Sequence, residues 1–144
     1  MKQTTWTVLA DKAQAAVRDA QQQLSEARHR VDKLEGSIAH LDHLRDDYIA
    51  RYNETQKVAH SISDTITYRK FLEHLRGLRR KVESQLQDAN LQLADAKAEQ
   101  SRALREQAKM EAMVERDERN RALAAAKIEQ RALDEAGLRL FNLR

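Results

Sequence analysis

The feature that most constrains the fold is a heptad repeat of apolar side chains that begins near the N-terminus. Two interleaved series each advance by seven residues, and thirteen of their fourteen positions are apolar or aromatic. The series are Ala10, Val17, Leu24, Val31, Ile38, Arg45, Tyr52 and Trp6, Ala13, Ala20, Ala27, Leu34, Leu41, Tyr48. An average spacing of 3.5 residues keeps one stripe of a helix facing a partner helix, which is typical of a coiled coil. The repeat therefore predicts a first helix over about residues 5–56, capped by Thr4 or Thr5.

A second heptad repeat follows a polar connector. Its positions are Leu75, Val82, Ala89, Ala96, Ala103, Met110 in one series and Leu86, Leu93, Val114 in the other. Between the repeats, Ser61, Ser63 and Asp64 compete for backbone hydrogen bonds and favour helix caps over helix interiors. We therefore predict a bend at about 57–63 and a second helix over about 64–136. Gly137 is the expected C-terminal stop, followed by a short end piece at 137–144.

The composition supports long helices with a thin buried stripe. The 144 residues include no Pro and only three Gly, and 34% are charged. Pro is the residue that breaks a helix, while the Ala, Leu, Glu, Lys, Arg and Gln that fill this sequence favour one. The predicted fold class is all-α: one domain over 1–144, formed by a long antiparallel two-helix coiled-coil hairpin. Antiparallel pairing around a bend near residue 60 sets Tyr48 against Phe71 and Leu41 against Leu78.

The cellular setting follows from what the sequence lacks. No apolar run approaches the ~20 residues that span a bilayer, and the N-terminus has no apolar signal-peptide core. The absence of Cys removes any need for an oxidising compartment. The sequence thus predicts a cytoplasmic protein.

Catalytic chemistry finds little support in the sequence. There is no HExxH motif, no glycine-rich phosphate loop and no acidic calcium loop. His40, His43 and Asp47 have helical spacing, but two ligands on one face make a weak metal site. The other histidines, His29, His60 and His74, add no third ligand at a suitable spacing. We expect no enzymatic activity, no metal and no cofactor.

Two surfaces of the predicted hairpin are candidates for binding a partner. Tyr48, Tyr52, Tyr68 and Phe71 flank the bend, and a slender two-helix hairpin cannot bury four rings completely. They either cap the hairpin core or leave a docking patch exposed. The second surface is a basic cluster, for which nucleic acid or a membrane surface are possible partners. The alternative, a solvated flank with some charges paired across the hairpin, is the one we favour. The cluster comprises Arg69, Lys70, Arg76, Arg79, Arg80 and Lys81.

Several of these features together resemble a known family. They are the Ala-rich first helix, the Asp47-Tyr48 pair, the Tyr68-x-x-Phe71-Leu72-x-x-Leu75 motif and the mixed-charge C-terminal helix. This layout is similar to that of FliJ, the small coiled-coil protein of the flagellar type III export apparatus. Family members often carry Tyr at the place of Leu44 and Trp shortly before Tyr68, where this chain has Ile66-Thr67.

The resemblance implies a non-enzymatic, stalk-like hairpin similar to the central stalk of rotary ATPases. It would promote the hexameric export ATPase, escort export chaperones and couple the ATPase to the membrane export gate, serving flagellum biogenesis and motility. It would be peripheral to the inner membrane through the gate only, and would bind no nucleic acid. The gate-facing residues would be Leu41, Leu44, Tyr48, Phe71, Leu75 and Leu78. The ATPase-facing residues would be Trp6, Met110, Val114, Arg116 and Arg119.

Two other functions remain open at the level of sequence. The equivalent stalk of a virulence secretion system has the same periodicity. A homodimeric coiled-coil scaffold is also possible, because a heptad seam can pair with itself as readily as across a hairpin.

Overall fold

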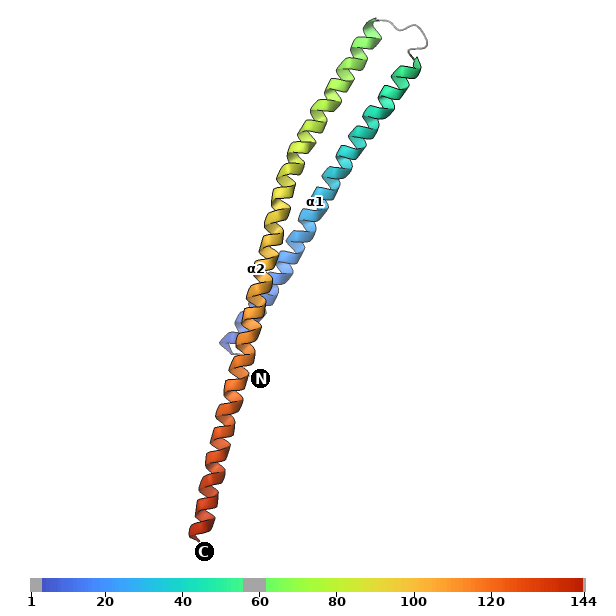
Figure 1. Ribbon diagram of the computed structural model, residues 1–144. Helices are drawn as coiled ribbons and strands as arrows, with labels where there is room; N and C mark the ends of the chain where they lie inside the picture. The colour runs from blue at the N-terminus through green and yellow to red at the C-terminus, as the bar shows by residue number, and fades with distance from the viewer. Residues whose placement is uncertain (1–3, 56–61, 144) are drawn as a thin grey trace. The chain divides into compact units, whose positions relative to one another are not determined.

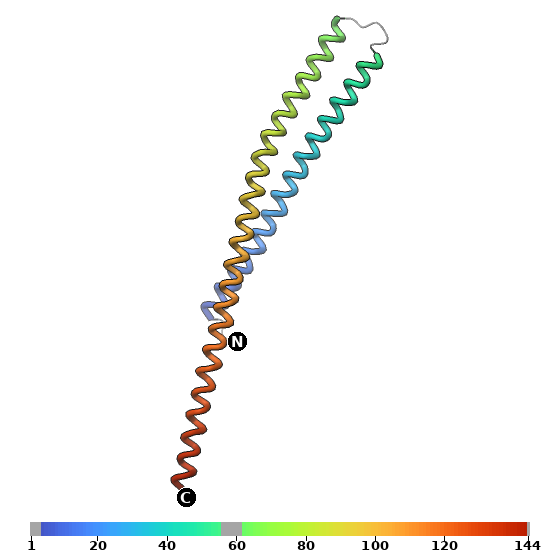
Figure 2. Tube along the Cα trace, viewed as in Figure 1, coloured from blue at the N-terminus to red at the C-terminus, as the bar shows by residue number. Residues whose placement is uncertain are grey.

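The computed structural model describes residues 4–55 and 62–143 of the chain, and almost all of them are helical. Helix α1 covers Thr5–Thr55 and helix α2 covers Ile62–Asn142 (Figure 1). The tube in Figure 2 follows each helix without a break between its first and last residue. No strand occurs in these two stretches. The predicted all-α helical hairpin is confirmed.

The N-terminus of α1 is capped by Thr4, as the sequence predicts. The amide of Thr7 donates to Thr4 Oγ1 at 3.2 Å, and the amide of Thr4 donates to Thr7 Oγ1 at 2.8 Å. This reciprocal pair satisfies one free amide of the first turn and fixes the entry of the chain into the helix.

The ends of α2 differ from the prediction. The helix begins at Ile62, so Ser63 and Asp64 lie in its first turn, and the rest of the predicted bend falls outside the described residues. At the other end, α2 continues through Gly137 to Asn142, so the predicted stop at Gly137 is wrong. Gly137 does not have a positive φ, and a Cβ there would meet no neighbouring atom. Without a left-handed turn to end the helix, the helix-favouring residues on either side of Gly137 continue it.

The chain divides into two compact units, each containing part of both helices. Unit 2 covers Ala20–Glu99, and unit 1 covers Met1–Asp19 with Gln100–Arg144. The expectation of one domain over 1–144 stays a prediction.

In unit 2 the helices are antiparallel, and the heptad positions form the core. Contacts join residues 48 to 71, 42 to 79 and 30 to 92, so partner numbers fall along one helix as they rise along the other. The most buried side chain is Ala89, which is 1% exposed, and Leu75 is 5% exposed. Full burial of a Leu side chain contributes ~1.5–3 kcal/mol. The other buried members of this core are Ala20, Leu24 and Val31.

In unit 1 the buried side chains are smaller. Ala13, Val17 and Ala103 are its buried residues, and all three occupy predicted heptad positions. Met110 and Val114 are half-buried, and Asp117 is the last residue of α2 that is not exposed. The side chains of α2 therefore cease to be buried just beyond Val114, the last of the predicted heptad positions.

Candidate partner-binding surfaces

The four aromatic side chains predicted near the bend pack on one another across the two helices of unit 2. The rings of Tyr52 and Tyr68 stack with centroids 3.7 Å apart, and Tyr48 lies 5.4 Å from Tyr68. Phe71 is tilted against Tyr48 at 4.1 Å, which confirms the predicted Tyr48–Phe71 pairing. Tyr52 Oη lies 3.2 Å from Thr65 Oγ1. All four rings are half-buried, so each contributes to the core and still presents an edge to solvent.

Five of the six residues predicted to face the export gate are at least partly exposed, and we call them the tip surface: Leu41, Leu44, Tyr48, Phe71 and Leu78. Leu44 is 37% exposed and Leu78 is 39% exposed, while the other three are half-buried. Leu75, the sixth predicted residue, is buried and belongs to the core in this structure.

A hollow of about 440 Å³ adjoins the tip surface. Leu41 and Leu78 both line it, as expected from their predicted pairing, together with Val82. Gly36 also lines the hollow, and a Cβ at Gly36 would meet nothing within 4 Å. The hollow is therefore an open apolar depression, with Lys33, Ser37 and His40 completing its lining.

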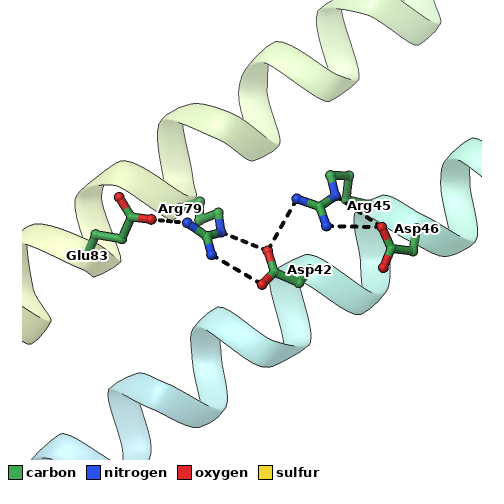
Figure 3. Close-up of polar contacts among 5 residues, drawn as sticks. All are labelled: Asp42, Arg45, Asp46, Arg79 and Glu83. Atoms are coloured by element: carbon green, nitrogen blue, oxygen red, sulfur yellow. Dashed lines mark hydrogen bonds and ion pairs between the residues drawn. The ribbon is translucent and has the colours of Figure 1, made fainter.

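Beside Leu41 of the tip surface, a charged cluster joins the two helices of unit 2 (Figure 3), and its residues Asp42, Arg45 and Arg79 line one hollow with Leu41. Arg79 donates from Nε to Asp42 Oδ1 at 2.7 Å and from Nη2 to Asp42 Oδ2 at 3.3 Å. Its third nitrogen, Nη1, contacts Glu83 on α2. Arg45 lies 3.5 Å from Asp42 and 3.1 Å from Asp46. Arg45, the one polar residue in the first heptad series, thus sits in a polar layer rather than in a gap of the core.

The two-pronged pairing of Arg79 with Asp42 affects the ionisation of both groups. The hydrogen bonds from Arg79 lower the pKa of the Asp42 carboxyl below its ordinary value of 3.8. The same bonds raise the pKa of Arg79. Because the pair is solvent-accessible, it contributes little to the free energy of folding. Its main effect is to fix the register of the two helices.

The basic cluster separates into two groups. Arg79 is paired across the hairpin, as our favoured interpretation predicts. The remaining five residues, Arg69, Lys70, Arg76, Arg80 and Lys81, are exposed, and the described part of the chain offers them no ion pair.

The residues predicted to face the ATPase all belong to unit 1. Trp6 is 37% exposed, Met110 and Val114 are half-buried, and Arg116 and Arg119 are exposed. Beyond them, every residue of 118–143 is exposed. This segment, which we call the bare end of α2, has one ion pair just at its border, Arg121 to Asp117 at 3.3 Å. Its exposed large apolar side chains are Leu123, Ile128, Leu133, Leu138, Leu140, Phe141 and Leu143.

Neither a metal site nor a membrane span is found in the described residues. No group of three or more His, Cys, Asp or Glu side chains there is placed to hold a metal ion. No helix in the described residues is both long and apolar enough to cross a bilayer.

Sequence reasoning did not identify Asp42 as the partner of Arg79, and it missed the hollow at Gly36 and two exposed isoleucines, Ile62 and Ile66, at the start of α2. For the pairing of Arg79 with Asp42, the only signal in the sequence was the unexpected charge of Arg45 in an apolar series. Ile62 and Ile66 lie outside the heptad series, so periodicity gave no reason to single them out.

The described residues thus form a helical hairpin with an aromatic tip surface in unit 2 and an exposed end of α2 in unit 1. The family model described as Flagellar FliJ protein matches residues 3–144. The chain therefore belongs to the FliJ family, as the resemblance indicated, and is a component of the flagellar export apparatus. The family match favours the flagellar stalk over its virulence counterpart. Searches of curated proteins and of solved structures found no match.

Proposed function

We propose that the chain is a non-enzymatic coupling protein with two working surfaces. The bare end of α2, which includes Arg119, binds the hexameric export ATPase together with Trp6, Met110, Val114 and Arg116, and promotes its assembly. The tip surface engages the cytoplasmic part of the export gate, and the protein escorts export chaperones. In this assembly it works in the cytoplasm, at the cytoplasmic face of the inner membrane.

The single observation that carries the proposal is the exposure of the whole segment 118–143. Phe141 is 74% exposed and Ile128 is 69% exposed, and neither has a partner helix in this region of α2. Large apolar side chains on a helix that the chain itself does not cover are expected at a binding surface. A hexameric ring with a mixed apolar and polar channel would cover such a helix on all sides.

The tip surface supports the second half of the proposal. Interface anchors are usually aromatic or large apolar side chains that are held rigid before binding. Stacking among Tyr48, Tyr68 and Phe71 fixes their rings, and the neighbouring Leu44 and Leu78 remain exposed. The adjoining hollow gives an incoming apolar side chain somewhere to insert.

The division of labour is tested with a double variant of the tip surface, Leu44→Gln with Leu78→Gln. Both side chains are exposed, so the fold should tolerate the change. We expect loss of binding to the cytoplasmic part of the gate and loss of swimming, while stimulation of the ATPase stays near wild type. A matched control is Leu91→Gln with Leu104→Gln, which alters two exposed leucines elsewhere on α2 and should leave both activities intact. Equal loss of gate binding and ATPase stimulation in the tip variant would contradict two separate surfaces.

The competing function is a self-associating scaffold. The observed antiparallel pairing of α1 with α2 in unit 2 already occupies the heptad seam, which leaves no seam for a second copy. Analytical ultracentrifugation should therefore give a monomer at all concentrations. A dimer whose population grows with concentration would favour the scaffold.

A further inference from the structure

We propose that the outer face of α2 at its N-terminal end binds an anionic lipid surface directly. This goes beyond the proposed function, in which the only route to the membrane is through the gate, and it does not depend on that function. The surface consists of two exposed isoleucines followed by five exposed cations. We call it the lipid face: Ile62, Ile66, Arg69, Lys70, Arg76, Arg80 and Lys81.

Apart from Arg76, which lines a hollow with Asp42 and Arg45 of α1, the residues of the lipid face lie on the side of α2 that points away from α1. Successive residues advance by ~100° around an α-helix. With the buried Leu75 marking the side toward α1, Ile62, Ile66 and Arg69 come out on the opposite side, and so does Arg80. The exposure of all of these side chains agrees with that placement. Figure 1 shows this part of α2 at the end of unit 2 where the helix begins.

The isoleucines are exposed to a degree that the hairpin does not explain. Ile62 is 81% exposed and Ile66 is 49% exposed, and they are one helical turn apart. The seam of α2 is filled by other residues, Tyr68, Phe71 and Leu75, so neither isoleucine is needed for packing against α1. The apolar stripe of α2 that packs against α1 is not available to a membrane surface. These two side chains lie outside that stripe.

The charge of the lipid face is strongly one-sided. Its five cations have no ion pair in the described chain, and Glu73 is the one acidic residue between Arg69 and Lys81. The facing end of α1 is different, because its exposed residues Asp46, Asp47 and Glu54 are acidic and Arg51 is paired with Asp47 at 3.2 Å. Among the described residues at this end of unit 2, the cations without an ion pair thus lie on α2, and their charge is complementary to an anionic surface.

The combination of exposed isoleucines and cations favours an anionic lipid surface over other polyanions as the binding partner. Single-stranded nucleic acids are usually bound by aromatic platforms on which bases stack, and the lipid face has no aromatic residue. Aliphatic side chains beside a cluster of Lys and Arg are instead the pattern of helices that lie at the boundary of head groups and acyl chains. Each such cation near an anionic bilayer strengthens binding about fivefold.

The test is flotation of the purified full-length protein with two kinds of vesicle. One contains phosphatidylcholine mixed with phosphatidylglycerol, and the other contains phosphatidylcholine alone. We expect binding to the anionic vesicles only, weakened by added salt. The variant Arg69→Gln with Arg80→Gln should reduce the affinity roughly twentyfold. Its matched control, Arg105→Gln with Lys109→Gln, removes two exposed cations elsewhere on α2 and should bind like the wild type.

A second pair of variants tests the apolar contribution. Ile62→Gln with Ile66→Gln should weaken vesicle binding several-fold, whereas Leu123→Gln with Leu133→Gln, which alters two other exposed aliphatic residues, should not. Circular dichroism would verify that each variant remains helical. The proposal is overturned if the wild type fails to float with anionic vesicles, or if both cation variants lose affinity equally. It is also overturned if the isoleucine variant binds as well as the wild type, because the surface would then attract any polyanion, including nucleic acid.

Discussion

The two ends of α2 are stabilised in different ways. At its start, Tyr68, Phe71 and Leu75 pack against α1, so tertiary contacts hold the helix. At its far end, residues 118–143 are exposed on all sides, and only helix propensity and local pairs support the backbone. One continuous helix thus combines a part that is fixed by contacts with α1 and a part that the described chain leaves uncovered.

The largest effect should come from removing a packed side chain at the start of α2. Leu75→Ala is expected to lower the free energy of unfolding by about 2–4 kcal/mol, because it leaves a cavity at a buried site. Leu133→Ala, the same change at the bare end, should stay within about 0.5 kcal/mol of the wild type. Urea denaturation followed by circular dichroism measures both. Similar losses at the two sites would mean that the bare end also packs against something.

The next largest loss of stability should come from removing the N-cap of α1. Thr4→Ala should reduce stability by about 1 kcal/mol, since the Thr7 amide loses its acceptor. Thr5→Ala is the control, because Thr5 is exposed and lies one residue inside the helix, and it should change stability much less. The same urea titrations apply. A larger loss from the Thr5 variant would assign the cap to Thr5.

At the bare end we expect a smaller effect, and it should be a gain in stability instead of a loss. Gly137→Ala should favour the helix by about 0.5–1 kcal/mol, because an added Cβ meets no neighbour and Gly is a poor helix former. Amide hydrogen exchange of residues near 137 should slow accordingly. Faster exchange would show that the chain turns at Gly137 after all, as its sequence had suggested.

The smallest effect concerns the charged cluster at the tip and depends on pH. The pKa of Asp42 is lowered in the folded protein, so the pairing with Arg79 contributes fully above the unfolded value near 3.8. Its contribution is lost as the pH falls through the folded pKa, which lies below that value. Asp42→Asn should therefore remove a small part of the stability at neutral pH and converge with the wild type in strong acid. If the difference in the free energy of unfolding between the wild type and Asp42→Asn instead grew as the pH falls, the pairing with Arg79 could not be its cause.

Periodicity explains why so much of the fold was predictable. The heptad series alone identifies Val17, Leu24, Leu75 and Ala89 as core residues, since burial in a two-helix hairpin follows sequence spacing. The residues of the tip surface were those that the family resemblance implied, apart from Leu75, which its heptad position places in the core.

Two kinds of feature could not be predicted from the sequence: those that depend on one specific contact, and those that depend on a segment having nothing packed against it. The partner of Arg79 depends on the register of the hairpin, which spacing alone leaves uncertain by a turn. The end of α2 depends on whether Gly137 adopts a left-handed conformation, and nothing in the local sequence decides that. The exposure of Ile62 and Ile66 depends on the direction in which α2 begins.

Binding of the export ATPase by the bare end of α2 can be tested with one titration. The full-length protein and a chain that ends at Asp117 are added to the export ATPase of the same organism, while ATP hydrolysis and ring size are followed together. We predict a saturable rise in hydrolysis with hexamer formation for the full-length protein and no rise for the shortened chain, whose tip surface still binds the gate. Equal stimulation by both chains would contradict the account.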